Sequence, residues 1–353
     1  MSYVLCDISA FRFHRVPPQV LALCPPVPSP ETDRRRRALR GCPLASEVLG
    51  LPLHVLVGSR DMLGSRALER RHLWGGEVPI GGIWDTEMGV RVTSPLLTLL
   101  SLASRVNEVH LLMAVYEFCG SFSVFRPSAA VEMELKRAFA SGALGSSDGW
   151  RRVPGSGGRP SSLWVRDPLI SIDELRRFAT EHIGDRGGRK LFDAAQKVTG
   201  VAASPLEVQA SILFSLSRRK GGEGLDCFEN NYRISMNHSA QRIAEQQKAY
   251  ADLHFVSADG LRSVIVECQG LSVHGETGVS GRDADRATAL QSMGYDVVML
   301  TRGQLADPGR FAAVATMLRK RLGYPEYPKT EAMKRREVDL RANLFIDWET
   351  LGE

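Results

Sequence analysis

Two acidic residues in a pair of short apolar segments constrain the fold of the C-terminal half more than any other feature. Segment 251–255 contains Asp252, and segment 264–269 contains Glu267 in an otherwise apolar run. An Ala-Asp-Gly turn lies between the two segments, so the pattern predicts two strands joined in a hairpin. Because side chains alternate along a strand, Glu267 and Gln269 should share one face, and the residue between them should point to the other.

Neighbouring segments predict that this hairpin belongs to a larger α/β sheet. Segment 296–300 is as apolar as 264–268, and continuous apolar strands are typical of a sheet covered by helices on both faces. The sequence Ser-Pro-Leu-Glu at 204–207 is typical of a helix start, and segment 283–293 predicts a second helix that ends at Gly294. The chain is therefore expected to be an α/β protein in this region.

The two carboxylates predict a site for a hard metal ion. A carboxylate on one strand beside a carboxylate on the next gives the oxygen ligands that Mg²⁺ or Mn²⁺ prefers. Such an ion can polarise a phosphodiester and lower the pKa of an attacking water. Two like charges on a buried sheet would be costly without a cation, so Asp252 and Glu267 are predicted metal ligands. The alternative for Asp252 is a residue that only closes a turn.

The ordered set of motifs resembles the Vsr-like nuclease domain family of bacterial proteins, which belongs to the PD-(D/E)XK class. The resemblance covers residues 201–323 and rests on SPLE at 204–207, AD-x-x-F at 251–255, VIVECQG at 264–270, DADR at 283–286, AL-x-x-x-GYDV at 289–297 and LT-x-x-QL at 300–305. It implies a restriction-endonuclease-like domain with three layers and a mixed central sheet. It also implies that Glu207, Asp252 and Glu267 hold the metal and that His274 and Arg286 face the phosphate.

Gln269 departs from the pattern of the family. The related domains usually carry an acid at this position, and the wider class usually carries lysine. Glutamine cannot act as a general base or supply positive charge, but its carbonyl oxygen can bind a metal and its amide can orient a water. One hypothesis is thus a metal-dependent DNA endonuclease or nicking enzyme of bacterial defence or repair. The other is a catalytically inactive DNA-binding protein that keeps the nuclease fold.

Three of the candidate site residues also have simple structural interpretations. Glu207 stands three positions after Ser204 and can complete a capping box without excluding a role in the site. Asp283 and Arg286 are spaced to pair with each other on one helical face. His274 lies in a Gly/Ser/Val-rich segment, where a histidine is by default a surface residue.

Residues 1–140 predict a separate domain of mixed α/β structure. Segments 53–57 and 90–93 are typical of strands, Ser94-Pro95 opens an apolar helix, and a second helix is expected over 108–118. The segments SAFRFHR at 9–15, VTSPLLTLL at 92–100 and YEFCG at 116–120 are similar to AbiEi-type antitoxins and related regulators. That similarity implies a DNA-binding or toxin-neutralising role, as an antitoxin or transcriptional regulator, with a partner protein encoded nearby.

The remaining segments predict connections rather than further domains. Residues 141–162 are rich in glycine, serine and proline and predict a flexible linker. Residues 163–200 are expected to form a helical connector, beginning with a capping box at Ser171, and residues 324–353 a C-terminal tail. The arginine-rich run at 34–40 is either a solvated face or a phosphate-contacting patch.

Composition limits the function classes. A formal net charge of +5 is compatible with DNA binding without requiring it. Six scattered cysteines, without CxxC pairs, predict neither a disulfide framework nor structural zinc, and they favour a cytoplasmic location. No signal peptide or membrane span is recognisable, and no glycine-rich stretch has the form of a phosphate loop, so ATP or NAD is not expected.

Overall fold

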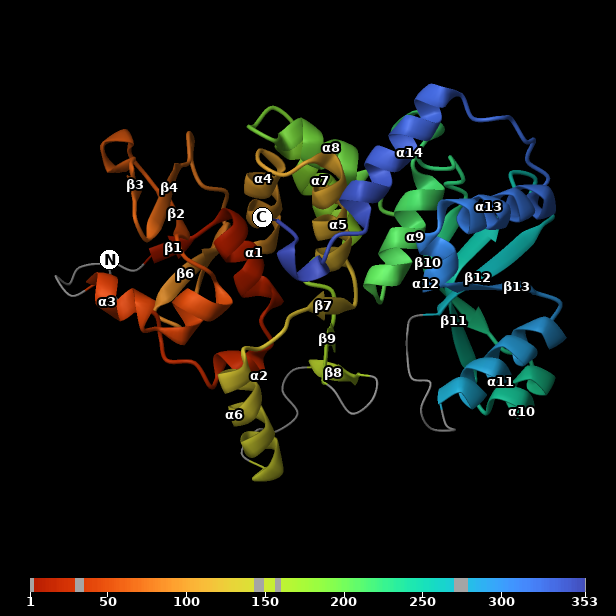
Figure 1. Ribbon diagram of the computed structural model, residues 1–353, viewed down its shortest axis with the longest axis horizontal. Coiled ribbons are helices and arrows are strands. Elements are labelled where there is room, and N and C mark those ends of the chain that lie inside the picture. The colour runs from red at the N-terminus through yellow and green to blue at the C-terminus, as the bar shows by residue number, and fades with distance from the viewer. Residues whose placement is uncertain (1–2, 29–34, 143–148, 156–159, 270–278, 353) are drawn as a thin grey trace. The chain divides into compact units, whose positions relative to one another are not determined.

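The part of the chain that the structure describes folds into a mixed α/β protein with three sheets (Figure 1). A computed structural model describes residues 3–28, 35–142, 149–155, 160–269 and 279–352. The chain divides into two compact units. The N-terminal unit comprises residues 1–152, 162–196 and 349–353, and the C-terminal unit comprises residues 153–161 and 197–348.

The N-terminal unit contains a six-stranded mixed sheet in the order β3-β4-β2-β1-β6-β5. β1 runs antiparallel to β2 and parallel to β6, and β2 runs parallel to β4. The strands of this sheet are β1 (Tyr3–Leu5), β2 (Leu53–Val57), β3 (Ser65–Arg66), β4 (Glu69–Leu73), β5 (Ile83–Asp85) and β6 (Val90–Thr93). The expected strands at 53–57 and 90–93 are confirmed as β2 and β6.

Several helices of this unit begin at residues whose side chains accept from a free backbone amide of the first turn. The side chain of Ser94 accepts from Leu97 at the start of α4, and Asn107 does the same for His110 at the start of α5. The helices are α1 (Asp7–Arg15), α2 (Pro18–Leu21), α3 (Arg35–Arg40), α4 (Pro95–Ala103), α5 (Glu108–Cys119), α6 (Ala129–Ala140), α7 (Ile172–Glu181) and α8 (Gly188–Ala195). A single π-helical turn covers Leu44–Val48.

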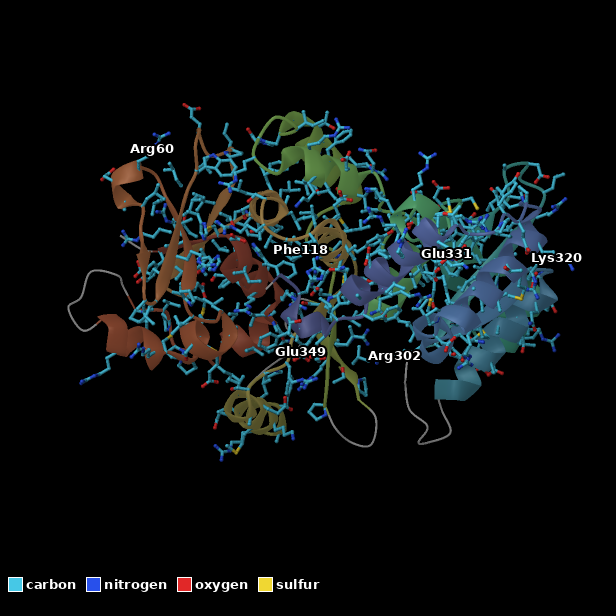
Figure 2. The ribbon with its side chains drawn as sticks, turned by 45° about the horizontal axis from the view of Figure 1, so that its top comes forward. Arg60, Phe118, Arg302, Lys320, Glu331 and Glu349 are labelled. Carbon is cyan, nitrogen blue, oxygen red and sulfur yellow. The ribbon has the colours of Figure 1, made fainter. Side chains whose placement is uncertain are left out.

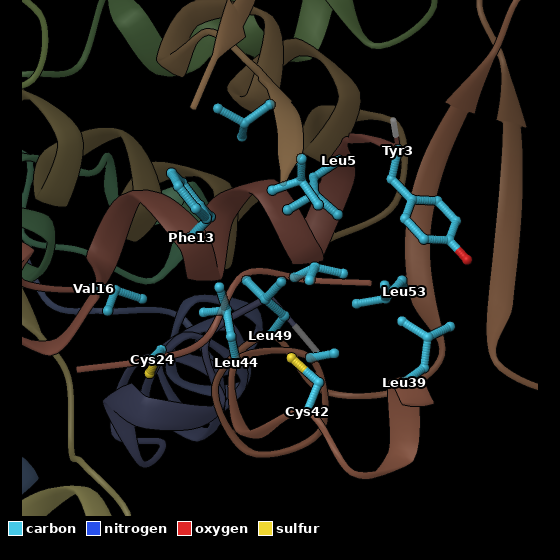
Figure 3. Close-up of a cluster of buried hydrophobic side chains, with 14 of the residues drawn as sticks. Tyr3, Leu5, Phe13, Val16, Cys24, Leu39, Cys42, Leu44, Leu49 and Leu53 are labelled. Atoms are coloured by element: carbon cyan, nitrogen blue, oxygen red, sulfur yellow. The ribbon is translucent and has the colours of Figure 1, made fainter. Parts of the chain in front are cut away.

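A buried apolar cluster joins the sheet of this unit to the segments around it. Figure 3 shows Tyr3 and Leu5 from β1, Leu53 from β2 and Phe13 from α1 turned toward one interior. Leu44 and Leu49 enter the same cluster from the π-helical turn and the residue after it. Removal of this apolar area from water is the main force that holds α1 on the sheet.

The segment predicted as a flexible linker contains regular structure. β7 (Phe122–Val124), β9 (Pro160–Val165) and β8 (Arg151–Pro154) form a three-stranded sheet in that spatial order. The following segment, predicted as a helical connector, contains α7 and α8, and the capping box at Ser171 is confirmed. Most of the connector groups with the N-terminal unit, whereas most of the predicted tail groups with the C-terminal unit and contains α14 (Glu331–Leu344).

The C-terminal unit contains a four-stranded mixed sheet in the order β10-β11-β12-β13. β10 and β11 are antiparallel, as are β11 and β12, whereas β12 and β13 are parallel. The strands are β10 (Phe228–Ser235), β11 (Lys248–Val256), β12 (Ser263–Gln269) and β13 (Asp296–Thr301). The predicted hairpin and the third predicted strand are therefore confirmed as elements of one sheet.

Helices cover both faces of this sheet (Figure 1). α10 (His238–Ala244) and α11 (Val279–Ser292) lie on one face, where Ala240, Ala289 and Leu290 pack with Ile265 of β12. α9 (Pro205–Ser215) and α13 (Pro308–Leu322) lie on the other. The short helix α12 (Arg302–Ala306) follows β13 directly.

Aromatic packing fixes α9 and α13 to their face of the sheet. The ring of Phe214 on α9 lies 5.3 Å from that of Phe255 on β11 and 4.9 Å from that of Phe311 on α13. Phe255 also lies 4.6 Å from Phe228 on β10.

Charged side chains such as Arg302, Lys320 and Glu331 are exposed on the helices of this unit (Figure 2). Within the described ranges, no helix combines the length and the apolar content needed to cross a bilayer.

Replacing Phe255 by alanine should destabilise the C-terminal unit. The side chain is fully buried between two strands and a helix, so its removal leaves a cavity and should lower the free energy of unfolding by about 3–5 kcal/mol. Denaturant titration followed by circular dichroism measures the loss. Leu261→Ala is the control, because this side chain is 84% exposed and its truncation should change stability by less than about 0.5 kcal/mol. Equal effects of the two substitutions would contradict this account of the core.

Candidate functional site

Asp252 and Glu267 occupy neighbouring positions of adjacent antiparallel strands. The β11–β12 ladder ends with the pair Leu253↔Val266, and the next position along it places Asp252 opposite Glu267. The Asp252 carboxylate accepts a 2.7 Å hydrogen bond from the backbone amide of Cys268. This side chain therefore satisfies an amide of the neighbouring strand where the ladder stops.

Glu207 approaches from the first turn of α9. Its carboxylate accepts hydrogen bonds from the Ala203 amide at 2.7 Å and from the Ser204 hydroxyl at 2.8 Å. The Ser204 hydroxyl in turn accepts from the Glu207 amide, so Ser204 is the N-cap of α9. The Glu207 carboxylate bonds the Ala203 amide instead of the Ser204 amide, so only half of the predicted capping box forms. The residue is only 6% exposed, and its carboxylate is close enough to Asp252 and Glu267 for the three charges to interact.

Arg286 pairs with Glu267. Its Nη2 atom lies 2.6 Å from the Glu267 Oε2 atom, which joins α11 to β12. The Glu267 side chain is 3% exposed and that of Arg286 is 31% exposed, so the pair runs from the interior toward solvent. This guanidinium places positive charge beside the acidic residues, which Gln269 on the strand cannot do.

The electrostatics of the cluster show that its negative charges are crowded. Burial, followed by the charge of Asp252, raises the pKa of the Glu207 carboxyl from 4.5 to about 8. Burial and the charges of Asp252, Glu207 and Glu267 raise the pKa of the Cys268 thiol well above its ordinary value. The protein therefore keeps a proton on Glu207 at neutral pH, and a bound cation would favour its release.

The two other predicted site residues, Gln269 and His274, are not part of this buried acidic cluster in the described structure. Gln269 lies exposed at the end of β12, opposite Thr301 of β13 in the register. His274 lies outside the described residues.

The geometry of the acidic cluster limits how it can hold a metal ion. Among the described residues, Glu207, Asp252 and Glu267 do not bring one oxygen each within 4.8 Å of one another. A single ion coordinated by all three therefore requires the side chains to shift. In the N-terminal unit, by contrast, Asp7, His54 and His72 do bring one ligand atom each within 4.8 Å.

Sequence reasoning missed Asn230, which helps to position Asp252. Asn230 is 2% exposed on β10, and its amide nitrogen donates to the Ser211 hydroxyl at 2.8 Å and to the Asp252 carbonyl at 3.2 Å. Thr199 donates to its side-chain oxygen at 2.7 Å. This buried network ties β10, β11 and α9 together next to the site. The only sequence signal was two consecutive asparagines within a segment that otherwise reads as a strand.

Comparison of the chain with models of protein families, with curated proteins and with solved structures finds no match.

The raised pKa of Glu207 has a consequence for stability. Between pH 4.5 and about 8 the folded protein retains a proton that the unfolded chain loses, so the free energy of unfolding should fall as the pH rises through this window. In Glu207→Gln this part of the pH dependence should disappear. Denaturant unfolding in EDTA at several pH values measures it.

The control for this measurement is Glu331→Gln. Glu331 is an exposed carboxylate at the start of α14, so its replacement should leave the slope of stability against pH unchanged. The same slope in wild type and Glu207→Gln would show that Glu207 does not hold the proton.

Proposed function

We propose that the C-terminal unit is a nuclease-type domain of the PD-(D/E)XK class, and that the protein is a metal-dependent DNA endonuclease or nicking enzyme of bacterial defence or repair. The observation that carries the proposal is the placement of Asp252 opposite Glu267 on antiparallel strands, with the buried carboxyl of Glu207 beside them. The element order α9, β10, α10, β11, β12, α11, β13 and the helices on both faces of the mixed sheet agree with a restriction-endonuclease-like three-layer fold.

The residues of the site fit a divalent cation with oxygen ligands. With Glu207 protonated, the carboxylates of Asp252 and Glu267 share one guanidinium, so the cluster keeps a net negative charge that a cation would balance. Asp252 and Glu267 would hold Mg²⁺ or Mn²⁺, with Glu207 as a third ligand after it loses its proton. When bound, such an ion polarises a phosphodiester and lowers the pKa of an attacking water.

The other side chains would act on the substrate. Gln269, exposed at the strand end, would orient the attacking water through its amide group. Arg286 would leave Glu267 when the cation binds and would steady the negative charge of the phosphate. The resemblance to the nuclease family implies that His274, which lies outside the described residues, would also face the phosphate.

A second candidate function is a catalytically inactive DNA-binding protein that acts as an AbiEi-like antitoxin or transcriptional regulator. The Arg286–Glu267 ion pair favours it, because the guanidinium already compensates the buried carboxylate that a metal would need. Gln269 also favours it, because glutamine supplies neither a base nor a charge. In this case the N-terminal unit would provide contacts to DNA or to a partner protein.

Cleavage assays distinguish the two candidates. Purified wild type with Mg²⁺ or Mn²⁺ should nick or cut at least one of supercoiled, linear and mismatched DNA. Asp252→Ala and Glu267→Gln should each lower the rate at least about a hundredfold, because each removes a metal ligand. The matched control is Asp296→Asn, which removes an exposed carboxylate paired with Arg321 at the opposite end of the same sheet.

Wild type that behaves like Asp252→Ala on every substrate would exclude the endonuclease. Retention of DNA binding by both proteins in a mobility-shift assay would then support the inactive regulator.

A further inference from the structure

Three segments of the N-terminal unit bring two imidazoles and a carboxylate to one point. His54 lies on β2 and His72 on the neighbouring parallel strand β4, where Leu56 is its register partner. His54 and Leu56 are two positions apart, so both histidines project from the same face of the sheet. Asp7 begins α1 directly after β1, which is the other neighbour of β2.

The backbone at Asp7 is held in an unusual conformation. Its φ angle is 53°, in the left-handed region that residues other than glycine rarely adopt. The Asp7 amide donates to the Ser101 hydroxyl at 3.2 Å, and the His54 amide donates to the Ser9 hydroxyl at 3.0 Å. These contacts hold the aspartate side chain at the histidines in spite of the conformational cost, and such strain is concentrated at functional sites.

The distances among the three groups are close to those of a metal's ligands. His72 Nε2 lies 3.1 Å from His54 Nδ1, and Asp7 Oδ2 lies 3.6 Å from His54 Nδ1 and 3.9 Å from His72 Nε2. With metal–ligand bonds of about 2.0–2.2 Å, ligand atoms are spaced about 3–3.5 Å apart, so shifts of a few tenths of an ångström would suffice. The side chains of Asp7, His54 and His72 are 3%, 10% and 13% exposed.

Arg105 currently provides the positive charge at this point. Its Nε atom pairs with Asp7 Oδ2, and its Nη2 atom donates to His72 Nδ1. His72 must therefore carry its proton on Nε2 and donate it to Nδ1 of His54, because an arginine has no acceptor. The Arg105 side chain is 37% exposed, so it can leave toward solvent when another cation takes its place.

The hydrogen bonds of His72 require a neutral ring, because its Nδ1 atom accepts from Arg105. When Arg105 leaves, the ring proton can move from Nε2 to Nδ1, and Nε2 is then free to bind a metal. Asp7, His72 and Arg105 also line a cavity of about 810 Å³, together with Trp74, Ser101 and Arg186. The cavity offers room for the remaining ligands of a metal.

We propose that Asp7, His54 and His72 form a binding site for a divalent first-row transition metal such as Zn²⁺, for which Arg105 is the competing cation. Imidazole ligands favour these metals over Mg²⁺, which prefers oxygen. The alternative is a purely structural network in which Arg105 anchors the residues after α4 to the sheet. Removal of Arg105 distinguishes the two alternatives. It should strengthen metal binding if the residues form a metal site, whereas it should only destabilise the fold if they form a structural network.

Cobalt titration of the full chain tests the proposal. The protein is used in an Asp252→Asn, Glu267→Gln background, so that the acidic cluster of the C-terminal unit does not contribute, and it is first dialysed against EDTA. One equivalent of Co²⁺ should bind and give visible absorption bands, and Zn²⁺ should displace it. His72→Gln should weaken binding at least about a hundredfold, whereas Arg105→Ala should strengthen it at least about tenfold, because the competing charge is gone.

The controls address folding and specificity. His238→Gln removes an exposed histidine of the C-terminal unit and should leave Co²⁺ affinity unchanged. Circular dichroism melting shows whether each variant is folded, and Zn²⁺ should raise the melting temperature of wild type but not of His72→Gln. Equal Co²⁺ affinity of wild type and His72→Gln would overturn the proposal. Binding by Arg105→Ala alone would also overturn it, because Arg105 would then exclude metals from the native chain.

Discussion

Compensation of buried carboxylates is the constraint on which both units depend. Glu117, fully buried in the N-terminal unit, accepts from Arg15 at 2.8 Å and from the Val124 amide at 2.9 Å. Glu223 in the C-terminal unit is 4% exposed and lies 2.6 Å from Lys329. An ionised carboxylate left uncompensated in such places would cost several kcal/mol. These two acids are satisfied by contacts that tie distant segments together, so their roles are structural.

In the two candidate sites, the buried carboxylates are compensated by a proton or by an arginine that reaches solvent. Glu207 retains a proton, Glu267 pairs with a guanidinium that reaches solvent, and Asp7 pairs with one that is more than a third exposed. We expect that a metal ion can replace a proton or a partly exposed arginine at these sites without unfolding the surroundings. This difference separates the proposed sites from the structural ion pairs of the same chain.

The fold was predictable from the sequence where the spacing of apolar residues matched the burial of the helix or strand that they form. Strands 264–269 and 296–300 are apolar because helices cover both faces of their sheet, and α4 and α7 begin at recognisable capping residues. β4 has the sequence Glu-Arg-Arg-His-Leu and β10 alternates irregularly, so neither resembles a buried strand. The Gly/Ser-rich linker contains strands because cross-strand pairing, which local composition cannot reveal, determines their structure.

The candidate sites were predictable to different degrees for the same reason. Hairpin spacing sufficed to place Asp252 beside Glu267, since the register follows from a short turn. The spacing of Asp283 and Arg286 fitted an ion pair within one helix equally well. The sequence therefore could not show that Arg286 pairs with Glu267 on β12. Asp7, His54 and His72 come from three strands or strand ends with no common local motif, so only the sheet order brings them together.

The most direct test of the central claim is the location of manganese in crystals of the full chain, measured by anomalous scattering. The account predicts a peak between the carboxylates of Asp252 and Glu267, with the Arg286 guanidinium moved away from Glu267. An intact Arg286–Glu267 ion pair with no manganese peak beside it, at a Mn²⁺ concentration that saturates other sites in the crystal, would contradict it.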